Sequence, residues 1–144
     1  MYTGSCLCQS VKYEVDGALS DFGQCHCRSC QKASGSAYAA NAGVRRGDFR
    51  VTSGAADLRE FESSPGKLRV FCSRCGSPIY AYLRADAEHV RIRLGTLDTP
   101  LDGRPKAHFW VSEKAPWEII ESTLPQFPGW APRDVLDAKG SKQP

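Results

Sequence analysis

The sequence contains no long hydrophobic run, because its uncharged apolar stretches are only a few residues long. A membrane-spanning helix of about 20 apolar residues is therefore excluded, and no membrane partner is expected. The first residues, MYTGSCLC, have neither the basic nor the apolar region of a secretory signal peptide. We therefore expect a cytoplasmic protein, whose thiols stay reduced.

The chain also lacks a basic stripe with interleaved aromatic residues, the pattern typical of nucleic-acid-binding surfaces. Its formal net charge of +3 counts every cysteine as neutral. Four thiolates around one Zn²⁺ would carry about −2 and three around another about −1, so that the basic balance would vanish. No nucleic-acid partner is therefore expected.

Long amphipathic helices, internal repeats and low-complexity segments are absent as well, and apolar and polar residues alternate instead. The segment VKYEVDG places Val11, Tyr13 and Val15 on one face of a strand. HVRIRLG alternates in the same way, with Arg91 and Arg93 on its polar side. Further candidate strands span residues 36–44, 48–54, 57–63, 67–73, 78–84 and 107–111.

Gly and Pro interrupt these segments often, and 144 residues suit one domain. The pattern predicts an all-β fold, mainly β with one or two short helices, built of short strands in small sheets. The short helices are expected in RSCQKAS (28–34) and APRDVLDA (131–138). We place the domain at residues 1–130 and a partly frayed extension at 131–144. Sheets this small need further stabilisation, which bound metal would supply.

The segment FCSRCGSP resembles a zinc knuckle, in which Cys72 and Cys75 face one metal from a tight turn. Gly76 tolerates the left-handed backbone that such a turn requires. The rival interpretation is a thioredoxin-like redox pair, which requires a helix that begins at the motif. Pro78, followed by a strand pattern, favours the knuckle over that alternative.

A closed tetrahedral zinc site needs four ligands, and SCLC offers Cys6 and Cys8 at the start of the chain. Their spacing places both side chains on one face of an extended segment. We therefore predict a structural zinc on Cys6, Cys8, Cys72 and Cys75. Four buried thiols without a metal are the alternative, since free cysteine is a common core residue.

Three cysteines remain in QCHCRSCQKASG, namely Cys25, Cys27 and Cys30. Three ligands leave a coordination position open for water or substrate, as in catalytic zinc sites. His26 could close this site as a fourth ligand, although on a strand its side chain would point away from its neighbours. A redox-sensing thiol cluster is a further alternative. A zinc deaminase is excluded, because H-x-E and P-C-x-x-C elements are missing.

A zinc ion with three thiolate ligands is a weak Lewis acid and suits a soft fourth ligand, such as a substrate thiol. It would hold that thiol as a reactive thiolate, which adds to or leaves a small carbonyl carbon. Arg28 and Lys32 flank the cluster and could offset its negative charge, or could simply form a solvated face. No paired carboxylates or Cys–His dyad point to acid–base catalysis.

Six segments together resemble the glutathione-dependent formaldehyde-activating enzyme family, which shares its domain with centromere protein V. They are GSCLCQSVKYEV, CHCRSCQKASGSAY, FCSRCGSPIY, GTLD, PKAHFW and KAPWEII, and the resemblance as a whole runs from about Gly4 to Phe127. The resemblance implies a β-tent fold of small antiparallel sheets, the structural and catalytic zinc ions described above, and carbon–sulfur lyase activity. The implied reaction interconverts S-hydroxymethylglutathione with glutathione and formaldehyde.

Glutathione is thus the expected small-molecule partner, and its carboxylates would need cationic residues. The candidates are Arg45, Arg46, Arg91, Arg93 and Lys106. His108 and Trp110 lie in a family motif, where we expect a buried histidine and a core aromatic. The alternative function is a zinc-stabilised binding or scaffold module without catalysis. The sequence does not indicate the oligomeric state.

Overall fold

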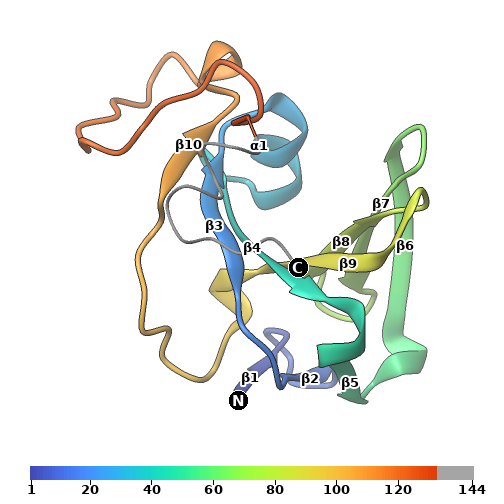
Figure 1. Cartoon of the computed structure of the whole chain (residues 1–144). Coiled ribbons are helices and arrows are strands. Elements are labelled where there is room, and N and C mark those ends of the chain that lie inside the picture. Colours follow the sequence, from blue (N-terminus) through green and yellow to red (C-terminus); the bar gives the residue numbers. More distant parts are fainter. Residues whose placement is uncertain (133–144) are drawn as a thin grey trace.

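The computed structural model of the chain describes residues 1–132 and consists mostly of β-strands, as predicted (Figure 1). A three-stranded sheet has the order β1-β2-β5, and a seven-stranded sheet has the order β10-β3-β4-β9-β8-β7-β6. The strands are β1 (Tyr2–Ser5), β2 (Lys12–Val15), β3 (Ser20–Cys25), β4 (Ala39–Arg45), β5 (Phe49–Ser53), β6 (Leu58–Ser64), β7 (Lys67–Cys72), β8 (Pro78–Leu83), β9 (Asp86–Arg93) and β10 (Ala107–Phe109).

The helical content of the described residues is small. Helix α1 (Arg28–Ser34) coincides with the predicted segment RSCQKAS. The other predicted helix, at 131–138, lies outside the described residues except for its first two positions. The remaining turns are the 3-10 helices η1 (Arg46–Asp48), η2 (Ala55–Asp57), η3 (Leu94–Thr96) and η4 (Val111–Glu113).

One strand pairing departs from the antiparallel pattern that the family resemblance implies. Strand β10 runs parallel to β3, with Phe109 opposite Cys25 and Ala107 opposite Gly23. The main chain continues this contact beyond the strands, because the His26 N–H donates to the Phe109 carbonyl at 2.8 Å. The pairing brings the segment after residue 106 beside the end of β3, where the three-cysteine cluster begins.

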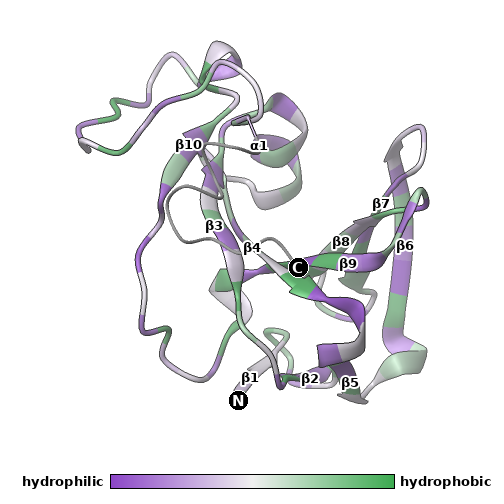
Figure 2. Cartoon of the chain, in the orientation of Figure 1, coloured by the Kyte–Doolittle hydropathy of each residue, from purple (hydrophilic) through white to green (hydrophobic). Residues whose placement is uncertain are grey.

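The main core lies where the three-stranded sheet packs against one face of the seven-stranded sheet. Val11, Tyr13 and Val15 are buried there, as their alternation predicts, and Tyr13 is only 1% exposed. The Tyr13 hydroxyl lies 2.7 Å from Thr96 Oγ1, which satisfies its buried polar end. Green and purple segments alternate along the strands, as expected for sheets with two unlike faces (Figure 2).

The opposite face of the seven-stranded sheet carries polar residues, and part of it lines a cavity. Val90 and Ile92 of β9 are buried in the main core, and Arg91 and Arg93 project to the other side, as predicted. Arg93, however, is only 8% exposed. This part of the face lines a cavity rather than the outer surface, which accounts for the low exposure of Arg93.

Candidate metal centres

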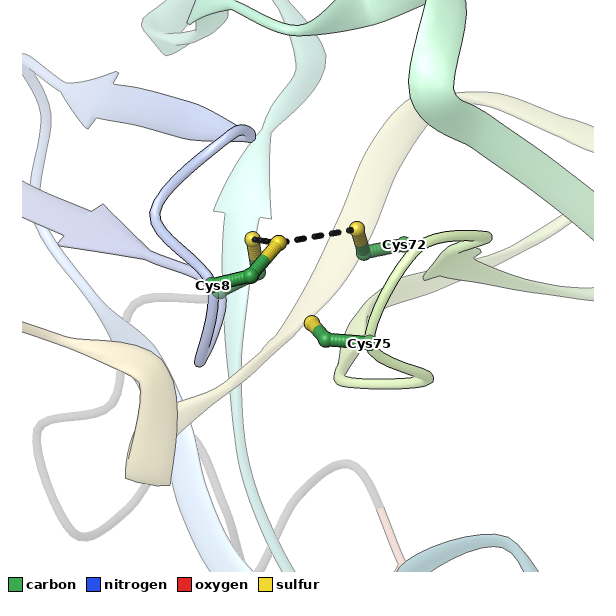
Figure 3. A group of neighbouring side chains, drawn as sticks. Cys8, Cys72 and Cys75 are labelled. Carbon is green, nitrogen blue, oxygen red and sulfur yellow. Dashed lines mark hydrogen bonds between the residues drawn. The ribbon is translucent and has the colours of Figure 1, made fainter.

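The structure brings Cys6, Cys8, Cys72 and Cys75 together, and their sulfur atoms all lie within 4.8 Å of one another. This four-cysteine centre joins the loop after β1 to the turn between β7 and β8. Figure 3 shows the side chains of Cys8, Cys72 and Cys75 pointing toward a common point from these two segments. The N-terminal segment is thereby attached to the middle of the chain.

The sulfur positions fit a tetrahedral zinc ion. Zn–S bonds of about 2.3 Å place tetrahedral sulfurs about 3.8 Å apart. The Cys6 and Cys8 sulfurs are 3.5 Å apart, and those of Cys8 and Cys72 are 3.9 Å apart. These separations are far longer than the S–S bond of a disulfide, and all seven cysteines are free.

The turn that carries Cys72 and Cys75 has the geometry of a knuckle. Gly76 adopts the left-handed φ of 79° that the sequence predicts, and its N–H donates to the Cys72 carbonyl at 2.8 Å. Strands precede and follow this turn, so the helix that a thioredoxin-like redox pair requires is not there. Hydrogen bonding from Ser77 lowers the pKa of Cys75 to about 5, which favours the thiolate that a metal needs.

Ser10 is a member of this centre that the sequence reasoning missed. Its Oγ lies 3.2 Å from the sulfur of Cys8, 3.5 Å from that of Cys72 and 3.7 Å from that of Cys6. A hydroxyl in this place can donate to thiolates and stabilise their charge. No spacing rule in the sequence indicates this role, since the contact with Cys72 spans 62 positions.

The second cluster contains Cys25, Cys27 and Cys30, whose sulfurs also lie within 4.8 Å of one another. Cys25 ends β3, Cys27 is the N-cap of α1, and Cys30 lies in the first turn of that helix. The Cys30 N–H donates to the Cys27 sulfur at 3.3 Å, so the thiol acts as a capping group. The turn from β3 into α1 thus brings the three sulfurs of this three-cysteine centre toward one another.

Negative charge in the three-cysteine centre concentrates on Cys30. Hydrogen bonds from Cys25 and Cys27 lower the pKa of Cys30, and the positive charges of Arg93 and Arg69 add to this effect. The same shared hydrogen bonds, together with burial, raise the pKa of Cys25. The cluster therefore holds at least one thiolate readily, as a metal site requires.

His26 lies outside this sulfur cluster, although its neighbours Cys25 and Cys27 belong to it. It is fully buried, and its Nε2 lies 2.9 Å from Nδ1 of His108. His108 is buried as predicted, and its Nε2 lies 2.8 Å from the Ser122 hydroxyl. These contacts hold the His26 ring behind the centre.

A cavity of about 890 Å³ opens beside the three-cysteine centre, a size that suits a small organic ligand. All three cysteines line it, together with Trp110 and four cationic residues. Trp110 packs against the cysteines rather than only in the core, and its φ of 58° is rare for a residue with a side chain. The cationic residues are Lys67, Arg69, Arg91 and Arg93.

Of the five cations predicted as partners of the glutathione carboxylates, only two lie at the cavity. Arg91 and Arg93 line the cavity, whereas Arg45, Arg46 and Lys106 are not among its lining residues. Arg46 instead lies over the Tyr82 ring, 4.8 Å from its centre.

The cations that flank the cysteines in the sequence form a solvated face, one of the two roles expected for them. Arg28 and Lys32 are exposed on α1, and Arg28 donates to the Gln31 side chain. Lys67 and Arg69, which sequence reasoning did not select, take the place beside the centre. Because Lys67 and Arg69 alternate with core residues on β7, the sequence shows that they lie on the face opposite the core. Only the pairing of the strands shows that this face lies beside the cysteines.

The sequence matches the family model described as "Glutathione-dependent formaldehyde-activating enzyme" over residues 1–113, which include all seven cysteines. The chain belongs to this family. A protein of Halomonas elongata named "Putative glutathione-dependent formaldehyde-activating enzyme" is 32% identical over 128 residues, covering 83% of this chain and 80% of that protein. The crystal structure of a Rhodobacter sphaeroides protein is similar with a TM-score of 0.56 and 27% identity, covering 69% of this chain and 91% of that chain.

For this member of the glutathione-dependent formaldehyde-activating family, the two centres differ in their surroundings. The four-cysteine centre has four sulfurs, the number that a closed tetrahedral site needs, and Cys72 belongs to the main core. The three-cysteine centre borders a cavity large enough for a substrate. Within residues 1–132, no helix is long and apolar enough to cross a membrane.

Proposed function

We propose that this protein is a zinc-dependent enzyme of the carbon–sulfur lyase type. It would interconvert S-hydroxymethylglutathione with glutathione and formaldehyde. The observation that carries the proposal is the contrast between one closed set of four sulfurs and one set of three that borders a cavity. Family membership supports glutathione as the thiol partner. A reducing compartment such as the cytoplasm would keep the thiolate ligands available.

In this proposal Cys6, Cys8, Cys72 and Cys75 hold a structural zinc, and Cys25, Cys27 and Cys30 hold a catalytic one. The catalytic zinc would supply a soft Lewis-acidic position that favours the thiolate form of a substrate thiol. In the forward direction the S–C bond forms, the carbonyl π bond of formaldehyde breaks, and its oxygen takes up a proton. The thiol gives up its proton to solvent.

The chain's own residues prepare this reaction in three ways. The capped first turn of α1 fixes the Cys27 and Cys30 sulfurs in position before the substrate arrives. The guanidinium of Arg69, 3.9 Å from the Cys30 sulfur, offsets the negative charge of the cluster. Trp110 packs over the cysteines and limits the access of water to them.

Metal content and thiol binding test the proposal together. Protein purified without chelator should contain two zinc ions per chain, and a maximum of one after reconstitution contradicts the division into two centres. With Co²⁺ in the three-cysteine centre, glutathione should change the thiolate-to-metal absorption band. Exchange spectroscopy by NMR should then show adduct formation faster than in buffer. No spectral change with any thiol and no rate increase favour the scaffold alternative.

A further inference from the structure

The cationic residues beside the three-cysteine centre share one face of the seven-stranded sheet. Arg69 of β7 is opposite Ala81 of β8, which is opposite Arg91 of β9. Arg91 in turn is opposite Gly43 of β4. Directly opposite residues project to the same side of an antiparallel sheet, so this row forms the floor of the cavity. Ala81 between the two arginines and Gly43 beyond Arg91 are small and leave space above the floor.

The cysteine cluster belongs to the same face. Arg93 lies two residues beyond Arg91 and is opposite Asn41, which is opposite Gly23 of β3. Cys25 lies two residues beyond Gly23 and therefore projects to the same side. A ligand held at the three-cysteine centre thus has the cations of β7 and β9 beneath it.

Two of the four cations that line this cavity have no carboxylate partner among the described residues. The three-cysteine centre with Zn²⁺ would carry about −1, and Arg69 contacts it through both terminal nitrogens, at 3.9 and 4.0 Å from the Cys30 sulfur. The charge of Asp21 acts on Arg91. Lys67 and Arg93 then have only the cysteine cluster as a source of opposite charge, and within residues 1–132 no carboxylate forms an ion pair with either.

The other carboxylates that line the cavity do not serve these two cations. Asp86 is hydrogen-bonded to His89, whose Nδ1 lies 3.0 Å from both carboxylate oxygens. Glu88 and Glu113 are exposed. A buried cation such as Arg93 without a carboxylate partner is costly, and half-buried Lys67 adds to that cost through its mutual repulsion with the neighbouring arginines. An anionic ligand would relieve it.

We propose that Lys67 and Arg93, with Arg91 beside them, form a carboxylate-binding subsite, so that the thiol handled at the three-cysteine centre carries a carboxylate. Arg93 is held for this task by the Asn41 side chain, to which it donates a hydrogen bond. The subsite selects carboxylate-bearing thiols over neutral thiols of similar size. The placement of a thiol at the three-cysteine centre rests on the proposed function. The binding of a carboxylate rests only on the positions of Lys67, Arg91 and Arg93.

Glutathione and its diethyl ester test this selection, because both carry the same thiol but only the former carries carboxylates. With Co²⁺ in the three-cysteine centre, we expect the ester to bind about tenfold to a hundredfold more weakly. In Lys67→Gln and Arg93→Gln, glutathione should lose most of this advantage while the affinity for the ester stays the same. Lys106→Gln, which removes a positive charge outside the cavity, should retain the preference.

S-methylglutathione distinguishes failure of the subsite from failure of the proposed function, because it has carboxylates but no free thiol. It should raise the melting temperature of the parent and of Lys106→Gln, and should do so less in Lys67→Gln. Lys67 is only half-buried, so this variant is informative even if Arg93→Gln does not fold. Equal binding of glutathione and its ester in the parent, or an unchanged preference in Lys67→Gln, overturns the subsite. Stabilisation by S-methylglutathione without any thiol effect on the cobalt spectrum supports the subsite and counts against the proposed function.

Discussion

Arg69 and Cys30 are 39 positions apart in the chain, yet a guanidinium nitrogen of Arg69 lies 3.9 Å from the Cys30 sulfur. The arginine is itself held in place, because its Nε donates to the Ser63 hydroxyl at 2.8 Å. A fixed positive charge at this distance favours the thiolate over the thiol. The sheet thus contributes directly to the charge balance of a centre that is built by β3 and α1.

Removal of this charge should loosen the metal of the three-cysteine centre. In Arg69→Gln the thiolates lose their charged hydrogen-bond donor, and we expect a chelator to extract one metal ion about tenfold faster. Stopped-flow measurement with a coloured chelator gives the two release rates separately. Arg59→Gln is the matched control, since Arg59 is exposed and donates only to backbone carbonyls. Equal release rates in both variants would show that Arg69 has no influence on the centre.

Loss of one ligand should have different consequences in the two centres. Cys72 is fully buried in the main core and joins two distant segments, so Cys72→Ser should be insoluble or lack fixed tertiary structure. Structural zinc contributes on the order of 10 kcal/mol, comparable to the whole stability of a small domain. Cys27→Ser should fold and lose only the second metal. Near-UV circular dichroism and metal analysis compare the two, and parent-like melting of both variants contradicts a structural role for the first centre.

Lys67 should make stability depend on alkaline pH. Burial, together with the charges of Arg91, Arg93 and Arg69, lowers the pKa of Lys67 to about 8. Below pH 8 the folded protein bears the cost of a charged Lys67. As pH rises further, the unfolded chain holds the extra proton, so this cost disappears.

Lys67→Met should therefore be more stable than the parent at pH 7, by about 1–3 kcal/mol, and this advantage should shrink between pH 8 and 10. Urea unfolding at several pH values measures the difference. Lys12→Met, which changes an exposed residue of β2, should show a difference that does not vary with pH. If the difference in unfolding free energy between Lys67→Met and the parent stayed constant across this range, Lys67 would not be a charged, half-buried residue with a lowered pKa.

Gly23 allows β10 to approach β3, and a larger residue should separate them. A Cβ atom at Gly23 would lie 2.1 Å from Cε2 of Phe109, a ring that is itself buried. Gly23→Ala should therefore destabilise the protein by about 1–3 kcal/mol through overpacking. Gly47→Ala should change stability by less than about 0.5 kcal/mol, since no heavy atom lies within 4 Å of its added Cβ. Thermal unfolding distinguishes the two, and similar melting temperatures would contradict this account.

Most of the strands could be predicted from the sequence, because in most of them one side packs against the core, and apolar and polar residues therefore alternate. Strand β6, which has no buried residue, is an exception to this packing. Strands β1 and β3 could not be predicted, since each contains a glycine that lies against an aromatic ring where a hydrophobic residue would be expected. An added Cβ at Gly4 would meet the Tyr13 ring at 2.2 Å, as one at Gly23 would meet Phe109. The parallel pairing of β10 is likewise a property of long-range register, which local patterns do not contain.

The two cysteine groups could be predicted from spacing, and the structure brings each together. That they bind zinc stays a prediction. The surroundings of the groups could not be predicted, because Lys67 and Arg69 reach the three-cysteine group, and Ser10 reaches Cys72, across long separations in the chain. The sequence analysis selected Arg91 and Arg93 together with three cations elsewhere, since a list of basic residues carries no information about which face they share.

The two centres also differ in how far apart their ligands lie along the chain, and this difference concerns the order of events during synthesis. Cys25, Cys27 and Cys30 span six residues and can gather around a metal while the rest of the chain is still unfolded. Cys8 and Cys72 are 64 positions apart, so their meeting requires closure of a long loop and the entropy that this costs. The centre that borders the cavity is therefore expected to take up its metal first in the nascent protein and to give it up first in the mature one.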